Sequence, residues 1–169
     1  MINITKNNLL KKSKKLFDYL KSNKRTLSSV ESCTGGLFSS TLTSIPGSSN
    51  VFEFGLVTYS NYSKNKFMNI PTHTLHRFGA VSEETALAMS KNLLKLSKNP
   101  ERNISISCTG IAGPTGGTEK KPVGTVFISF STLNKNETFH KKFYNLDREA
   151  VRLETVKFMF SHCVNFIEN

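Results

Sequence analysis

The chain has 169 residues, a formal net charge of +11 at pH 7 and three cysteines. The length predicts one domain over residues 1–169, and the lack of a long apolar run or a signal-peptide core favours a cytoplasmic protein without a membrane partner. An odd number of cysteines without metal-ligand spacing predicts neither a disulfide framework nor a zinc site.

The first predicted element is an amphipathic helix over residues 5–22. Its apolar positions lie near one face and its lysines occupy the other; the apolar positions are Leu9, Leu10, Phe17 and Leu20. Much of the positive charge is concentrated in the first 25 residues, and no basic stripe studded with aromatic residues follows it. We therefore favour a solvated helix face over a nucleic-acid-binding surface.

A short strand over residues 26–30 leads into the sequence Glu-Ser-Cys-Thr-Gly-Gly at 31–36. In open α/β sheets, a turn at the carboxyl end of a strand lies where ligands bind. The turn offers two candidate nucleophiles, Ser32 and Cys33, and its backbone N–H groups are candidates to hold an oxyanion, at Thr34, Gly35 and Gly36. Taken alone, the stretch is equally compatible with a plain strand-to-helix connection.

A second strand, over residues 55–59, ends at Tyr59 and leads into a helix with Ser60 as its predicted N-cap. Asn61 and Lys64 are three positions apart and are predicted to share a face of that helix. The helix dipole disfavours a cation in the first turn, so this placement favours the neutral amine that a general base needs. Without further context, Lys64 is more simply interpreted as an ordinary surface lysine.

A helix from Ser82 to about residue 97 precedes a third strand over residues 103–108 and a Gly-rich loop over 109–118. The glycines of this loop allow backbone N–H groups to point at a phosphate or carboxylate. No Gly-Lys-Ser/Thr ends the loop and no helix follows it, which excludes a Walker A loop and a dinucleotide fingerprint. Two Gly-rich turns after strands favour a shared ligand cleft over a long surface turn.

Two strands over residues 123–131 and 137–144 are predicted to pair antiparallel, and Asp147 to cap a last helix over 148–166. Arg148 and Arg152 are four positions apart on one face near the start of that helix. The helix dipole gives no reason for cations there. They either point at an anionic ligand or pair with Glu149 and other surface acids.

The combined motifs resemble the CinA C-terminal domain family, which includes the PncC-type nicotinamide-nucleotide amidases. The stretches that carry the resemblance follow the family's order and cover about residues 5–166; they are 31–36, 58–61 with Lys64, 79–82, 109–114 and 121–126. The resemblance implies an α/β fold, a three-layer α/β/α sandwich with a central mixed sheet, usually in a homo-oligomer. It also implies hydrolysis of nicotinamide mononucleotide to nicotinate mononucleotide and ammonia, without a metal or cofactor. Larger CinA proteins carry an extra N-terminal domain, and the resemblance is to the stand-alone form of the amidase domain.

Carried over by position, the resemblance implies that Ser32 is the nucleophile and that Tyr59 and Lys64 activate it. The implied substrate-binding positions are Asn61, Thr109, Gly110, Gly113 and Arg148. Lys120 and Lys121 are further candidates for the substrate phosphate. The chain departs from the family pattern at Leu146, at Thr115 and at Tyr62-Ser63, none of which removes a proposed catalytic group.

Two other functions stay open on this reasoning. One is a non-catalytic nucleotide-binding or nucleic-acid-binding protein on the same fold, with the basic N-terminal helix as its contact surface. The other is an amidase for a different anionic amide. The presence of Ser32, Tyr59 and Lys64 together favours an enzyme, because a binding module needs no activated hydroxyl.

Overall fold

The computed structural model describes residues 2–168, and the side chains of residues 7–168. Its elements follow the chain in the order α1 Ile2–Ser22, β1 Thr26–Glu31, α2 Leu37–Thr43, the 3-10 helix η1 Ser48–Asn50, β2 Phe52–Val57, α3 Asn61–Met68, α4 Thr72–Phe78, α5 Glu83–Leu94, β3 Asn103–Gly110, β4 Thr125–Ser131, β5 Asn136–Lys142 and α6 Arg148–Glu168.

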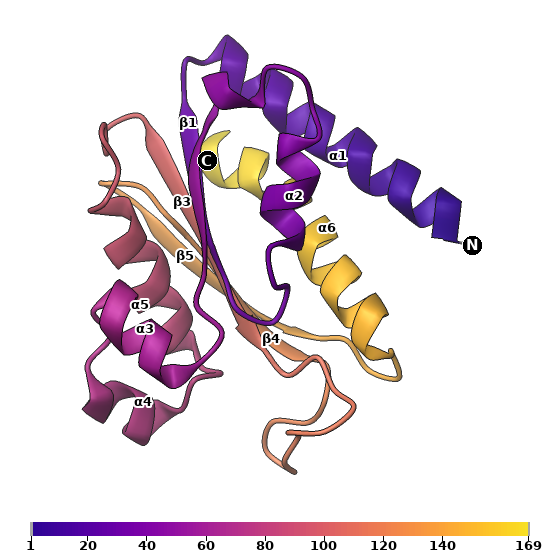
Figure 1. Cartoon of the computed structure of the whole chain (residues 1–169), viewed down its shortest axis with the longest axis vertical. Helices are drawn as coiled ribbons and strands as arrows, with labels where there is room; N and C mark the ends of the chain where they lie inside the picture. The colour runs from indigo at the N-terminus through magenta and orange to yellow at the C-terminus, as the bar shows by residue number, and fades with distance from the viewer. Residues whose placement is uncertain (1, 169) are drawn as a thin grey trace.

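The five strands form one mixed sheet in the order β2-β1-β3-β4-β5. β1 runs parallel to both β2 and β3, while β4 pairs antiparallel with β3 and with β5. Helices α1, α2 and α6 cover one face of the sheet, and α3, α4 and α5 cover the other (Figure 1). The predicted α/β/α sandwich with a mixed sheet is therefore confirmed, including the antiparallel pairing of its last two strands.

Strand β3 separates an apolar face from a hydroxyl-rich face. Ile104 and Ile106 pack into the core shared with α1 and α6. On the other face, Ser105 and Ser107 donate hydrogen bonds to α5 carbonyl groups, those of Ser90 and Ala86, at 2.7 and 2.6 Å. The alternation of isoleucine and serine in the sequence thus reflects two buried faces, one of which satisfies its polar groups through α5.

Three local predictions need correction. Leu10 is 37% exposed, so it lies beside the buried stripe of α1 instead of in it. Strand β2 covers Phe52–Val57 and not the predicted residues 55–59, so Tyr59 lies after the strand instead of ending it. Helix α5 ends at Leu94, short of the predicted residue 97. Within residues 2–168, we find no helix whose length and hydrophobicity would let it cross a membrane.

Candidate active site

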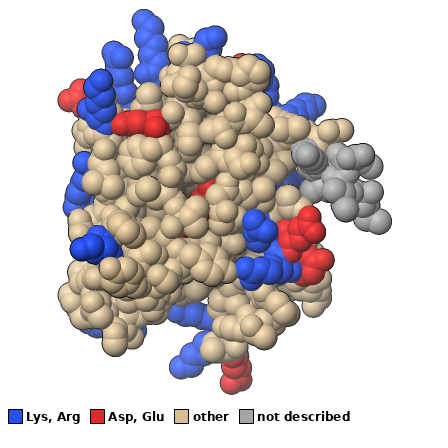
Figure 2. Space-filling view, in the orientation of Figure 1, with Lys and Arg blue, Asp and Glu red and all other residues tan. Residues whose placement is uncertain are grey.

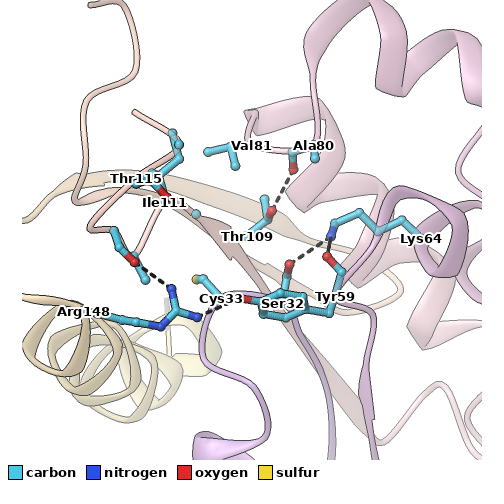
Figure 3. A pocket seen from close by; sticks show the side chains of 14 residues that line it. Ser32, Cys33, Tyr59, Lys64, Ala80, Val81, Thr109, Ile111, Thr115 and Arg148 are labelled. Carbon is cyan, nitrogen blue, oxygen red and sulfur yellow. Dashed lines mark hydrogen bonds between the residues drawn. The ribbon is translucent and has the colours of Figure 1, made fainter. Parts of the chain in front are cut away.

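A cavity of about 310 Å³ lies where β1 and β3 end and where the chain leaves β2. The sequence-predicted positions that line it are Ser32, Tyr59, Lys64, Thr109, Gly110, Gly113 and Arg148. Because β1, β2 and β3 are parallel, their carboxyl ends meet at one edge of the sheet. Topology therefore brings together residues that are up to 116 positions apart (Figure 3).

Lys64 reaches Ser32 from helix α3. Its Nζ lies 2.9 Å from the Ser32 Oγ, 2.8 Å from the Thr58 carbonyl oxygen and 3.5 Å from the Tyr59 carbonyl oxygen. The capping box made by Ser60 and Ser63 fixes the start of α3 and thereby the position of Lys64 in its first turn. The Lys64 side chain is buried, with 1% of the residue exposed, so it is not a surface lysine.

Burial lowers the pKa of Lys64. In the described residues, no Asp or Glu forms an ion pair with Lys64 to offset the lost hydration. As an ammonium, Lys64 donates to all three oxygens, those of Ser32 Oγ and of the Thr58 and Tyr59 carbonyl groups. As a neutral amine it has two N–H donors for the two carbonyl oxygens and a lone pair that can accept the proton of the Ser32 hydroxyl.

A buried carboxylate, that of Glu31, organises the turn that follows β1. It accepts hydrogen bonds from the Thr34 hydroxyl, from the backbone N–H groups of Gly36, Phe38 and Ser39, and from the Ser39 hydroxyl. A carboxylate at this position satisfies the free N–H groups of the first turn of α2 and complements its dipole. Glu31 therefore acts as the anchor of the nucleophile turn.

This anchoring differs from the expectation for the oxyanion donors. The Gly36 N–H donates to Glu31, and the Gly35 N–H donates to the Ser32 carbonyl oxygen at 3.1 Å. Neither group is free to meet a substrate. In the described structure, the N–H groups of Cys33 and Thr34 make no hydrogen bond to another residue, which leaves them as the unengaged donors of the turn.

Arg152 on α6 holds the same turn from the other side. Its Nε and Nη2 donate to the Thr34 carbonyl oxygen at 3.2 and 2.9 Å. The predicted alternative, in which Arg152 pairs with a surface acid, is not what the structure shows. Two N–H groups converging on one carbonyl fix the orientation of the peptide between Thr34 and Gly35.

Tyr59 and Arg148 form a second cluster at the mouth of the cavity (Figure 3). The Arg148 Nη2 donates to the Tyr59 hydroxyl at 2.7 Å, and its Nη1 donates to the Gly113 carbonyl oxygen at 2.8 Å. Tyr59 is 60% exposed, and it contacts Lys64 through its backbone carbonyl only. The structure thus joins the Tyr59 hydroxyl to Arg148 and not to the Ser32–Lys64 pair.

The remaining predicted binding residues fall into two groups. Thr109 is buried at the end of β3 and donates to the Ala80 carbonyl oxygen at 2.7 Å, which ties the Gly-rich loop to the segment before α5. Lys121 makes a similar link, because its Nζ donates to the carbonyl oxygens of Phe78 and Val81 and so uses two of its three N–H groups. Asn61 is exposed and does not line the cavity.

Cys33 lines the cavity beside Ser32 but is a poor source of thiolate. The neighbouring Cys108 thiol and complete burial raise the pKa of Cys33 well above its ordinary value. Among the residues that the structure describes, no group of His, Cys, Asp or Glu is placed to hold a metal ion.

The comparison with protein families decides the classification. The family model of the CinA C-terminal domain matches residues 9–167. This chain belongs to the CinA C-terminal domain family. A CinA-like protein of Petrotoga mobilis is 45% identical over 152 residues, which cover 90% of this chain and 37% of that protein. A CinA-like protein of Endomicrobium trichonymphae is 48% identical over 134 residues, 79% of this chain and 30% of that protein.

Solved structures agree with this CinA assignment. The competence/damage inducible protein CihA from Agrobacterium tumefaciens superposes with a TM-score of 0.90 at 34% identity, over 94% of this chain and 95% of that one. A CinA superfamily protein from Escherichia coli gives 0.85 at 28% identity, over 92% and 88%. The chain spans about a third of the length of the curated CinA-like relatives that it matches.

Two residues of this CinA domain were not predicted as parts of the site. Glu31 stands in the quoted motif, but a carboxylate that precedes a turn gives no sign that it will fold back onto the helix after it. For Arg152 the sequence predicts either an anionic ligand or a surface acid as the partner, and neither is the group that it holds. Its partner, the Thr34 carbonyl, lies 118 positions away, so no spacing rule connects them.

Proposed function

We propose that this CinA domain is an amidase that hydrolyses the carboxamide of nicotinamide mononucleotide. The products are nicotinate mononucleotide and ammonia. The single observation that carries the proposal is the 2.9 Å contact between Lys64 Nζ and Ser32 Oγ in a cavity at the carboxyl edge of the sheet. A hydroxyl beside a buried amine of lowered pKa is an activated nucleophile, and amide hydrolysis requires one.

The reaction follows from this pair. Neutral Lys64 accepts the Ser32 proton as Oγ attacks the carboxamide carbon, which gives a tetrahedral intermediate. The protonated amine then donates that proton to the leaving nitrogen, so that ammonia departs and an ester on Ser32 remains. Water attacks the ester with Lys64 again as the base, which releases the carboxylate product and restores the Ser32 hydroxyl.

The oxyanion of the intermediate needs preorganised donors. We assign this role to the N–H groups of Cys33 and Thr34, because those of Gly35 and Gly36 are engaged within the turn. Glu31 and Arg152 hold the turn from two sides, so the donors require no reorganisation when the charge develops. Donors that are already in place stabilise the transition state well, because no free energy is lost in moving them.

Arg148 is the cation that we assign to the substrate phosphate. It lines the cavity, and its two hydrogen bonds leave other N–H groups of the guanidinium free. We do not assign this role to Lys121, because it does not line the cavity and two of its three N–H groups donate to carbonyl groups. The cavity, about 310 Å³, is at the lower end of the usual range for small-molecule sites.

The proposal is tested by ammonia release from nicotinamide mononucleotide, with mass-spectrometric detection of the acid product. Wild type should turn over, while Ser32→Ala and Lys64→Met should each lose at least about a thousandfold in kcat. Lys66→Met, on an exposed position of the same helix, is the matched control and should retain activity.

The other outcomes separate the alternatives. Turnover that persists in Ser32→Ala contradicts the acyl-enzyme route. Failure with nicotinamide mononucleotide but hydrolysis of another anionic amide keeps the nucleophile and changes the substrate. Absence of all turnover, together with salt-dependent DNA binding that survives Ser32→Ala, would support a binding protein on this fold.

A further inference from the structure

A second pocket of the molecule lies at the amino ends of β1 and β3, away from Ser32. Its volume is about 390 Å³, and four cationic side chains line it together with two amides: Lys21, Lys24, Arg25 and Arg102, with Asn50 and Asn99. No Asp or Glu is among the described residues that line it. β1 has six residues, so about 20 Å of strand separates this pocket from the nucleophile turn.

The charges of this basic pocket are not neutralised within the fold. In the part of the chain that the structure describes, none of its four cations forms an ion pair with a carboxylate. Arg25 donates one Nη1 hydrogen bond to the Glu101 carbonyl oxygen at 3.1 Å, which steadies the guanidinium and leaves its other N–H groups open. Figure 2 shows Lys and Arg side chains projecting from the top of the view, where α1 ends and β1 begins in Figure 1.

Of the four cations, Lys24 stands at the backbone position that least suits its side chain. The Arg25 N–H donates to the Leu20 carbonyl and the Lys24 N–H to the Lys21 carbonyl, which is the Schellman pattern of a helix C-terminus. Lys24 is the left-handed residue of this motif, with a φ of 51°. Glycine or asparagine is preferred at such a position, because a Cβ is crowded there.

Helix electrostatics account for Lys21 but not for the whole cluster. A cation in the last turn of α1 complements the negative end of the helix dipole, so Lys21 alone has an ordinary structural reason. Arg25 and Arg102 lie outside α1, and Lys24 occupies a position that disfavours its side chain. Four cations around one concave surface, none of them ion-paired with a carboxylate of the described residues, are expected to attract a compact anion.

We propose that this basic pocket binds a polyphosphate group, either free or carried by a nucleotide. Guanidinium groups match phosphate oxygens in a bidentate way, and lysines add point charge. More than one phosphate is implied because four positive charges exceed what one phosphate dianion balances. A small ligand is favoured over a nucleic-acid strand, since the lining residues that the structure describes include no aromatic side chain to stack a base.

The site does not depend on the amidase proposal, because it lies at the other end of the sheet and its test measures binding. Inorganic pyrophosphate is titrated into the full chain by calorimetry at low ionic strength, with wild type, Lys24→Gly and Arg102→Gln. The matched control is Lys15→Ala, which removes the same charge from an exposed position of α1 outside the pocket.

We expect saturable binding by wild type, weakened at least about tenfold by Lys24→Gly and by Arg102→Gln, and less than about twofold by Lys15→Ala. Thermal unfolding separates binding from folding. Lys24→Gly should not lower the melting temperature, since glycine accommodates the left-handed backbone, and so its loss of binding cannot come from a damaged helix end.

Competition identifies the source of the phosphate groups. If a nucleoside triphosphate displaces pyrophosphate and binds more tightly than pyrophosphate does, the ligand is a nucleotide. If the two bind with equal affinity, the ligand is free polyphosphate. Both results support the site. Three results would overturn it: no saturable pyrophosphate binding, equal weakening by all three variants, or binding of a short DNA duplex by a protein that does not bind pyrophosphate.

Discussion

The Nζ of Lys64 lies 2.9 Å from the Oγ of Ser32, although the two residues are 32 positions apart in the chain. Ser32 directly follows β1, whereas Lys64 stands in the first turn of α3, after the neighbouring strand β2. The contact is buried and the amine meets two carbonyl oxygens besides the hydroxyl. The proposed amidase activity rests on this contact between Ser32 and Lys64.

The activity should rise with pH. The base is the neutral form of Lys64, and burial lowers the pKa of this group, so kcat is expected to increase through the lowered pKa and to level off above it. A pH–rate profile measures this directly. A rate that shows no rise with pH anywhere below the ordinary pKa of lysine, or that falls over that range, would contradict Lys64 as the base.

The same lowered pKa predicts a trend in stability. The unfolded chain binds a proton at Lys64 more readily than the folded chain does, so the free energy of unfolding should rise with pH between the folded pKa and the ordinary value for lysine. Urea unfolding at several pH values tests this. Lys64→Met should flatten the rise, while Lys66→Met should leave it unchanged.

Glu31→Gln should destabilise the protein and its site together. The amide keeps the shape of the side chain but loses the charge and replaces an acceptor by a donor, facing N–H groups of Gly36, Phe38 and Ser39. We expect a loss of at least about 2 kcal/mol in the free energy of unfolding. Glu154→Gln, on the surface of α6, is the control and should change it by less than about 0.5 kcal/mol.

Arg152→Lys should lower kcat about tenfold and change KM little. Arg152 holds the Thr34 carbonyl and does not line the cavity, so it acts on the position of the turn and not on substrate binding. Lysine keeps the charge but cannot direct two N–H groups at one oxygen in the same plane. Steady-state kinetics distinguish an effect on kcat from an effect on KM, with Arg77→Lys at an exposed position of α4 as the control. A change confined to KM would place Arg152 in substrate binding.

Cys33→Ala should retain most of the activity. The thiol lines the cavity, but its raised pKa leaves little thiolate at neutral pH. Ser32→Ala, measured in parallel, should be inactive. The reverse result, in which the cysteine variant fails and the serine variant turns over, would move the covalent chemistry to Cys33.

The sequence by itself determined the classification, the sandwich and the list of candidate residues. Hydrophobic periodicity and strand-turn-helix order are local properties, and they predicted the antiparallel pairing of the last two strands and the last helix correctly. The sandwich with a mixed sheet followed from the resemblance to the CinA C-terminal domain. The edge at which Ser32 and Thr109 meet also followed, because Gly-rich turns after strands predict a shared ligand cleft.

Only the tertiary structure decided which of these residues touch. It placed Lys64 on Ser32, turned the Tyr59 hydroxyl toward Arg148, and left Asn61 outside the cavity. It also gave the Gly36 N–H to Glu31, a contact that depends on how α2 leaves its turn. Hydrogen bonds act over about 3 Å, whereas sequence patterns fix positions only to within a turn or a strand, so contacts of this kind are set by packing.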